Sequence, residues 1–119
     1  MKIQELRIGV YLELPTRNEP IVIVEEILKN NFIICDITSN EWPLCDYKPI
    51  LLTEQWLKDF GFVYTEYRNW EKSSEDFGIE FNEDEFYFHV YGNAFNFQYV
   101  HQLQNLYFVL TGKELIKNP

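Results

Sequence analysis

Apolar and polar residues alternate in short runs along the first 48 residues of the chain, a pattern typical of strands. Turn-forming residues separate these runs, among them Pro15, Pro20 and the neighbouring Asn30 and Asn31. We therefore predict three strands, at residues 10–14, 21–28 and 32–37. Short strands joined by tight turns favour a small antiparallel N-terminal sheet, either SH3-like or a partial barrel.

A short helix is predicted directly after Thr53. A threonine side chain is a good N-cap, and Glu54 in the first turn suits the helix dipole. Gly61 is expected to end this helix, with Phe62 beyond it in contact with Leu57, as in a Schellman motif. The expected buried face consists of Trp56, Leu57 and Phe60.

The second half of the chain predicts a β-meander followed by a helix. Residues 62–67 alternate like a strand, and residues 77–81 and 86–91 pair naturally as a hairpin. A final helix is expected from about residue 97 to residue 111. The whole pattern predicts an α+β fold in one domain, residues 1–119. Its β part is three-stranded over residues 1–48, and the C-terminal helix packs on the sheet.

The C-terminal helix has one predicted core stripe and one aromatic residue outside it. The expected stripe is Tyr99, Leu103, Leu106 and Leu110, flanked by Val100, Tyr107 and Val109. Phe108 falls roughly opposite, on the side of His101 and Asn105. Phe108 is then either covered by a second element or exposed as a protein contact, and the sequence leaves both readings open.

Other aromatic side chains are candidates for binding. Tyr87, His89 and Tyr91 alternate along one strand, so they would present two phenols and an imidazole on one face. Such a face can stack on a flat ring, although a helix packed over it would cover it. Trp42 and Trp70 are expected in loops, where they would add walls to a pocket.

Composition narrows the class of protein. The chain has 119 residues, of which 46% are hydrophobic and 18% aromatic, enough for a modest core. Its formal net charge is −9, which repels duplex nucleic acid and suits a basic protein partner. The first residues do not resemble a signal peptide, and no stretch is long enough to cross a bilayer. We therefore expect a cytoplasmic protein that contacts neither membrane nor duplex nucleic acid, with both cysteines reduced.

Metal binding and catalysis find little support in the residue pattern. The soft ligands Cys35, Cys45, His89 and His101 contain no closely spaced pair, so neither a metal nor a cofactor is expected. The acidic run at residues 80–85 lacks the central glycine of a calcium loop. A small hydrolytic enzyme that uses His89 or His101 as acid or base stays an alternative, and the balance favours a protein without catalysis.

Three segments resemble a family of small proteins encoded by phages and prophage-like elements of gut bacteria. They are LRIG at residues 6–9, PILLTEQWLKDFGF at residues 49–62 and VHQLQNLYFVLTGKEL at residues 100–115. The chain departs from the family pattern at Val10, Leu51, Gln55 and Val109. This family is uncharacterised, so the resemblance supplies no catalytic residues.

The resemblance implies an accessory protein of a phage or mobile element that acts in the host bacterial cytoplasm. Such a protein would act by binding, for example by blocking a host defence protein. The alternative is an oligomeric sponge that sequesters a nucleotide-type signalling molecule between aromatic walls. The candidate binding residues for either activity are Trp42, Trp70, Tyr87, His89, Tyr91, His101, Asn105 and Phe108.

Overall fold

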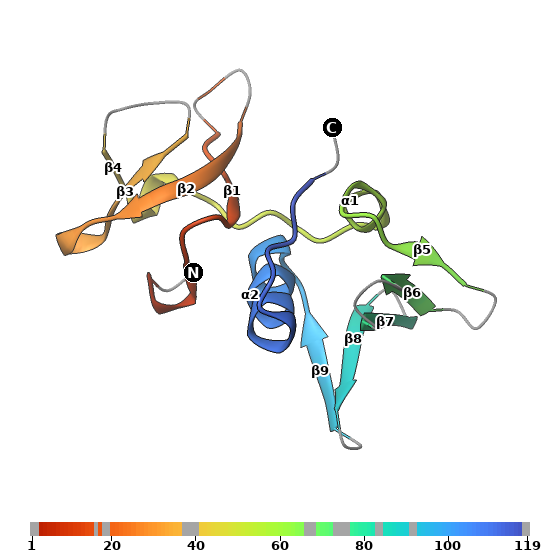
Figure 1. Cartoon of the computed structure of the whole chain (residues 1–119). Coiled ribbons are helices and arrows are strands. Elements are labelled where there is room, and N and C mark those ends of the chain that lie inside the picture. The colour runs from red at the N-terminus through yellow and green to blue at the C-terminus, as the bar shows by residue number, and fades with distance from the viewer. Residues whose placement is uncertain are drawn as a thin grey trace. The chain divides into compact units, whose positions relative to one another are not determined.

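The computed structural model describes residues 3–15, 17, 20–36, 41–65, 69–72, 77–82, 85–90 and 93–117. It has the predicted α+β fold, with an antiparallel N-terminal sheet, a second sheet and a C-terminal helix (Figure 1). The chain divides into two compact units, which we call unit 1 (Met1–Ile50 with Tyr99–Asn105) and unit 2 (Leu51–Gln98 with Leu106–Pro119). The expectation of one domain over residues 1–119 stays a prediction. No helix in the described part of the chain is long and apolar enough to cross a membrane.

Unit 1 contains an antiparallel sheet with the strand order β1-β2-β3-β4. Its strands are β1 (Tyr11–Glu13), β2 (Ile21–Ile27), β3 (Phe32–Cys35) and β4 (Trp42–Pro43). Three 3₁₀ turns accompany them, namely η1 (Ile3–Glu5), η2 (Lys29–Asn31) and η3 (Leu44–Asp46). The first three strands match the predicted ones. The fourth lies where a loop was expected, because Trp42 pairs with Ile33 of β3 and so extends the sheet.

Strand β2 pairs with one neighbour along its first part and with another along its second part, and a bulge lies near its middle. Its first part pairs with β1, where Ile23 lies opposite Tyr11. Its second part pairs with β3, with a shift in register between Val24 and Glu26. A bulge of this kind bends the strand and increases its twist, so the sheet curls into a half-barrel.

The half-barrel closes back onto its first strand just after η3. Glu13 and Lys48 form an antiparallel bridge and exchange two backbone hydrogen bonds, of 2.9 and 2.8 Å. The segment from β4 through η3 to Lys48 therefore runs from one edge of the sheet to the other. This return to the first strand is the closure that the predicted SH3-like or partial barrel requires.

Alternate residues of the first strands form the core of unit 1. Val10, Leu12 and Leu14 are fully buried, as the two-residue period of a strand requires when one face is covered. The buried cluster consists of Leu6, Val10, Leu12, Leu14, Val22, Val24, Ile33, Cys35 and Tyr47. Ile27, Trp42 and Leu44 pack against it from the edge. Leu44, the first residue of η3, and Tyr47, the residue after η3, are therefore both anchored in the core.

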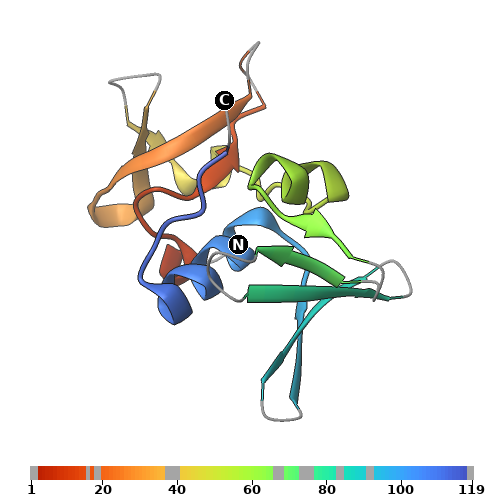
Figure 2. The same ribbon diagram turned by 45° about the vertical axis from the view of Figure 1, so that its right-hand side comes forward.

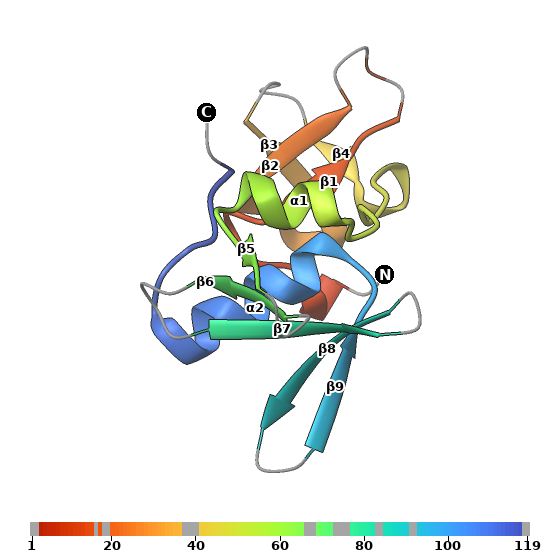
Figure 3. The same ribbon diagram turned by 90° about the vertical axis from the view of Figure 1, so that its right-hand side faces the viewer.

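Unit 2 contains a second antiparallel sheet, with the strand order β5-β6-β7-β8-β9. Its strands are β5 (Val63–Tyr64), β6 (Asn69–Lys72), β7 (Phe77–Asn82), β8 (Glu85–Val90) and β9 (Asn93–Phe97). The predicted hairpin of β7 and β8 is present, with Phe81 opposite Phe86. Figures 2 and 3 show the next pair, β8 and β9, running side by side, and five residue pairs join these two strands.

Two stretches of unit 2 differ from the prediction. Trp70 was expected in a loop, but it lies in β6 opposite Ile79 and is only 3% exposed. The last helix was expected to begin at about residue 97, but residues 93–97 form β9 and the helix begins at Val100. Their sequence, NAFNF, places Phe95 and Phe97 two residues apart, which is the period of a strand.

Helix α1 (Glu54–Asp59) confirms the predicted capping at both ends. The Thr53 side chain accepts a hydrogen bond of 3.4 Å from the backbone N–H of Trp56. At the other end, Gly61 has a φ of 91° and donates to Lys58, while Phe62 donates to Leu57. This pair of hydrogen bonds defines a Schellman motif, in which glycine adopts the left-handed conformation at little cost.

Helix α2 (Val100–Thr111) begins in unit 1 and ends in unit 2, and its buried face differs from the predicted one. The buried residues are Val100, His101, Leu103, Gln104 and Tyr107. Leu110 and Val109, both expected in or beside the core stripe, are 50% and 77% exposed. The prediction followed apolar residues alone, and the true stripe includes two polar side chains spaced three residues apart.

Candidate functional site

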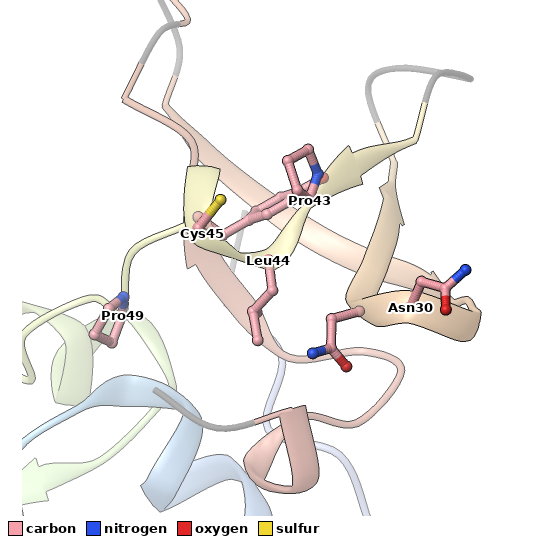
Figure 4. A pocket seen from close by; sticks show the side chains of 7 residues that line it. Asn30, Pro43, Leu44, Cys45 and Pro49 are labelled. Carbon is pink, nitrogen blue, oxygen red and sulfur yellow. The ribbon is translucent and has the colours of Figure 1, made fainter.

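The structure places an open pocket of about 510 Å³ on unit 1, next to the closure of the half-barrel. Its lining comes from the η2 turn and from the segment that begins in β4 and continues past η3. The lining residues are Asn30, Asn31, Pro43, Leu44, Cys45, Tyr47 and Pro49. Figure 4 shows the side chains that line it, with Leu44 between Pro49 and Asn30.

One wall of the pocket is the tight turn between β2 and β3. Asn30 and Asn31 have φ values of 64° and 63°, in the left-handed region that asparagine tolerates better than most residues. The backbone N–H of Leu28 donates to the carbonyl of Phe32 across this turn over 2.8 Å. Two consecutive left-handed residues fix the turn, and both asparagine side chains are exposed.

The other wall is the η3 turn with the residues on either side of it. Pro43 precedes η3 in extended conformation, with a φ of −65°, and the backbone N–H of Tyr47 closes the turn by donating to Leu44 over 3.0 Å. Tyr47 is 4% exposed, and its hydroxyl donates to the carbonyl of Ile33 over 3.1 Å. Burial and the neighbouring Cys35 thiol raise the pKa of the Tyr47 hydroxyl, so it stays protonated and keeps this hydrogen bond.

A thiol and a carboxylate lie together at the edge of the pocket. Cys45 is exposed, and its Sγ lies 3.9 Å from Oδ1 of Asp46. The second cysteine, Cys35, is 1% exposed and belongs to the core. The pocket therefore combines prolyl and leucyl surface with two carboxamides, one thiol and a neighbouring negative charge.

His101 lies away from this lining, in the buried part of α2. It is 1% exposed, its ring stacks on Tyr99 with centroids 6.0 Å apart, and its Nε2 lies 3.8 Å from Oε2 of Glu5. Among the described residues, neither ring nitrogen has a partner within hydrogen-bond distance. Burial lowers the pKa of His101, and the Glu5 carboxylate opposes this effect only in part. The imidazole is therefore neutral near pH 7.

Gln104 and Asn105 join α2 to the segment that leads into β1. Gln104 is fully buried; its Oε1 accepts from the N–H of Tyr11 over 2.8 Å and its Nε2 donates to Gly9 over 3.2 Å. The side-chain amide of Asn105 donates to the carbonyl of Glu5 over 2.6 Å. Arg7 donates to Oδ1 of Asn105 and to the carbonyl of Gln104, each over 3.2 Å. This network was not predicted from the sequence. The predicted core stripe contained only apolar residues, whereas the buried face of the helix includes Gln104.

The predicted site residues belong to several elements of the two units. Trp42 is half-buried against the core of unit 1, and its indole N–H is buried without a hydrogen-bond partner. Trp70 is buried in unit 2, with its ring 5.2 Å from that of Tyr64. Tyr87 is half-buried, and its hydroxyl donates to Glu85. The side chain of His89 and the whole of Tyr91 lie outside the described residues.

Phe108 is 39% exposed, whereas His101, with which it was grouped, is buried. The sequence left open whether Phe108 is covered or exposed, and its side chain is partly exposed. A binding role for Phe108 and His101 stays a prediction. Asn105 is half-buried and holds the hydrogen bonds described above.

The residues of the pocket were not predicted from the sequence. Two features of the sequence mark its walls, namely the adjacent asparagines at 30 and 31 and the prolines within residues 38–49. Nothing in the sequence shows that these two segments lie next to each other. Within the described part of the chain, no three His, Cys, Asp or Glu side chains are grouped so as to hold a metal ion. Comparisons with protein-family models, curated proteins and solved structures found no match for this chain. The geometry of unit 1 therefore carries the functional argument.

Proposed function

We propose that this protein is a non-catalytic binding protein and that the pocket of unit 1 is its contact site. The observation that carries the proposal is the pocket itself, a concave surface of about 510 Å³ bounded by two tight turns. Pro43, Leu44 and Pro49 supply apolar surface, while Asn30 and Asn31 supply hydrogen-bonding groups. Concave apolar surface with a few polar groups is typical of binding sites.

The chemistry of the described residues supports binding over catalysis. A general acid or base must reach the proton that it transfers, and the His101 side chain is only 1% exposed. In the pocket, Tyr47 is held protonated and hydrogen-bonded to Ile33. Among the described residues, neither group belongs to a nucleophile–base pair of the kind that covalent catalysis uses.

The biological setting of the proposal comes from the resemblance to phage-encoded proteins. We propose an accessory protein of a phage or mobile element that acts in the host bacterial cytoplasm by blocking a host protein, with counter-defence as one form of that role. The net charge of −9 supports a partner with a basic surface, because opposite charges speed association and select against acidic partners.

Capture from a bacterial lysate with matched variants tests this proposal. Cys45→Trp places a large ring at an exposed position of the pocket, whereas Cys45→Ser changes the same position without filling it. We expect a host protein that is retained by the wild type and by Cys45→Ser and lost with Cys45→Trp. Its affinity, measured with both proteins purified, should fall by about tenfold or more in Cys45→Trp. Equal affinity for both variants would show that the pocket is not the contact site.

A further inference from the structure

We propose that the pocket of unit 1 binds an extended, proline-containing peptide segment of its partner, with a basic side chain beside the proline. This inference rests on the proposed function and names the chemistry of the partner. It follows from four properties of the pocket, namely its apolar lining, its polar groups, its rigid turns and the charge next to it.

The apolar lining fits a prolyl ring. Pro43, Leu44 and Pro49 line the pocket together with the largely buried Tyr47. A proline of a peptide is a compact apolar ring that loses little conformational freedom on binding. Proline-rich peptides adopt the polyproline II conformation, and recognition domains bind them in grooves lined by aromatic residues.

The polar groups of the lining fit the backbone of such a peptide. A polyproline II segment has no internal hydrogen bonds, so its carbonyl groups are available to donors from a partner. The exposed carboxamides of Asn30 and Asn31 each carry an NH₂ donor. One wall of the pocket carries the asparagine NH₂ donors, and the other carries the apolar proline rings. This arrangement suits a polyproline II peptide, in which the backbone carbonyls and the pyrrolidine rings point in different directions.

The pocket is formed before any partner arrives. Its two asparagines are consecutive left-handed residues in a turn closed by the Leu28–Phe32 hydrogen bond. On the opposite side, Tyr47 is tied to the carbonyl of Ile33 and packed in the core. A preformed site loses little conformational entropy on binding, which favours recognition of a short segment.

The charge at the edge selects a basic neighbour. Oδ1 of Asp46 lies 3.9 Å from the Sγ of Cys45, which itself lines the pocket, so the carboxylate is within reach of a bound peptide. An arginine beside the proline can form a charge-assisted hydrogen bond with this carboxylate. The net charge of −9 favours the approach of the same peptide at longer range.

The test is a binding titration with a labelled peptide of about twelve residues, which spans roughly 37 Å as polyproline II. It carries prolines at every third position and an arginine beside the central proline. We expect its fluorescence anisotropy to rise with the wild-type protein and with Cys45→Ser. Affinity should fall about tenfold in Cys45→Trp and about threefold in Asp46→Asn. A matched peptide with glutamate in place of arginine should bind more weakly than the basic one.

A second readout reports directly on the pocket. Cys45 is exposed and Cys35 is 1% exposed, so a maleimide should modify Cys45 first, and mass spectrometry identifies the modified residue. Saturating basic peptide should slow the alkylation of Cys45, and the matched peptide with glutamate should slow it less at the same concentration. If the peptide binds without protecting Cys45, or binds Cys45→Trp as well as the wild type, the proposed site is wrong.

The remaining outcomes separate this inference from the proposed function. If adenosine monophosphate protects Cys45 and the peptide does not, the peptide class is wrong and the pocket binds a small molecule instead. If the peptide does not bind, but a host protein is captured by the wild type and lost with Cys45→Trp, the proposed function is supported and the inference about the peptide is wrong. If neither peptide nor captured protein responds to Cys45→Trp, both fall.

Discussion

The two halves of α2 differ in which side chains they bury. In the first half, the polar residues His101 and Gln104 are 1% and 0% exposed. In the second half, the apolar residues Phe108, Val109 and Leu110 are 39%, 77% and 50% exposed. Apolar residues are the ones usually buried in a helix, so position and partners, and not hydrophobicity alone, decide burial here.

Hydrogen bonding explains half of this contrast. Gln104 is buried with both ends of its amide paired, so the cost of removing it from water is offset. His101 is buried with no hydrogen-bond partner for its ring nitrogens among the residues that the structure describes, and burial of this kind costs free energy. The same half-helix therefore contains one polar residue that stabilises unit 1 and one that is expected to weaken it.

The largest expected effect comes from Gln104→Leu. This change leaves the N–H of Tyr11 and the carbonyl of Gly9 buried without their side-chain partner, at a cost of about 2–4 kcal/mol in the free energy of unfolding. Urea denaturation followed by circular dichroism measures it. A loss below about 0.5 kcal/mol would mean that the amide is not a structural link and that the contrast between the halves is accidental.

Asn105→Ala tests the next link of the same network. Asn105 donates to Glu5 over 2.6 Å and accepts from Arg7 over 3.2 Å, at a half-buried position. Because water can replace part of these bonds, we expect a smaller loss, of about 1–2 kcal/mol, in the same urea experiment. Asn105→Asp is the matched variant: it keeps the acceptor for Arg7 and loses the donor, so its loss should be smaller than that of Asn105→Ala. Equal losses for the two variants would assign the effect to the donor alone.

His101 should make stability depend on pH. Because burial lowers its pKa in the folded state, the unfolded chain binds the proton more readily. Above the ordinary pKa of about 6.5, His101 is neutral in both states and makes no pH-dependent contribution to the free energy of unfolding. Below that pH, the free energy of unfolding falls until the pH has dropped below the pKa of His101 in the folded state. The difference in the free energy of unfolding between wild type and His101→Leu, followed from pH 7.5 to pH 5, isolates it from the other titrating groups.

The variants at this site sharpen the pH test. His101→Leu should be as stable as the wild type or about 1 kcal/mol more stable at pH 7, since it removes two unpaired buried nitrogens. Glu5→Gln removes the carboxylate 3.8 Å from Nε2, so it should extend the fall in stability to lower pH. A His101→Leu protein with the same pH slope as the wild type would contradict the assignment.

The smallest effect is expected in the second half of the helix. Val109→Gln replaces an apolar side chain that is 77% exposed, so the free energy of unfolding should change by no more than about 0.5 kcal/mol. This is the reverse of the Gln104→Leu exchange, made five positions further along the same helix. A loss as large as that of Gln104→Leu would show that Val109 is covered in solution.

Local chemistry predicted from the sequence is what the structure reproduces best. Thr53 and Gly61 act at the ends of α1 through neighbours no more than a few residues away, so the sequence contains all of that information. The strand pattern of residues 10–14 was equally local, and the structure has strand β1 there with Leu12 and Leu14 buried. The fold class followed from such patterns.

The pocket and the face of α2 depend on residues far apart in the sequence. The pocket needs Asn31 and Pro43 on facing turns, and their approach results from the pairing of β3 with β4. The burial of Gln104 needs the backbone of Tyr11, which is 93 residues away. A polar residue is assigned to the surface by any hydrophobicity pattern, so only its tertiary partners reveal that it lies inside.

The composition of unit 1 has a consequence for how the protein folds during synthesis. Its first segment ends at Ile50 and its second, Tyr99–Asn105, emerges from the ribosome only after the intervening residues have been made. At about 5–20 residues per second, the N-terminal sheet waits for several seconds before Gln104 can pair with Tyr11. During that interval the polar backbone groups of Gly9 and Tyr11 lack their helix partner, and the sheet is open to chaperones. Gln104 can therefore complete its hydrogen bonds in unit 1 only after the residues between the two segments of that unit have been made.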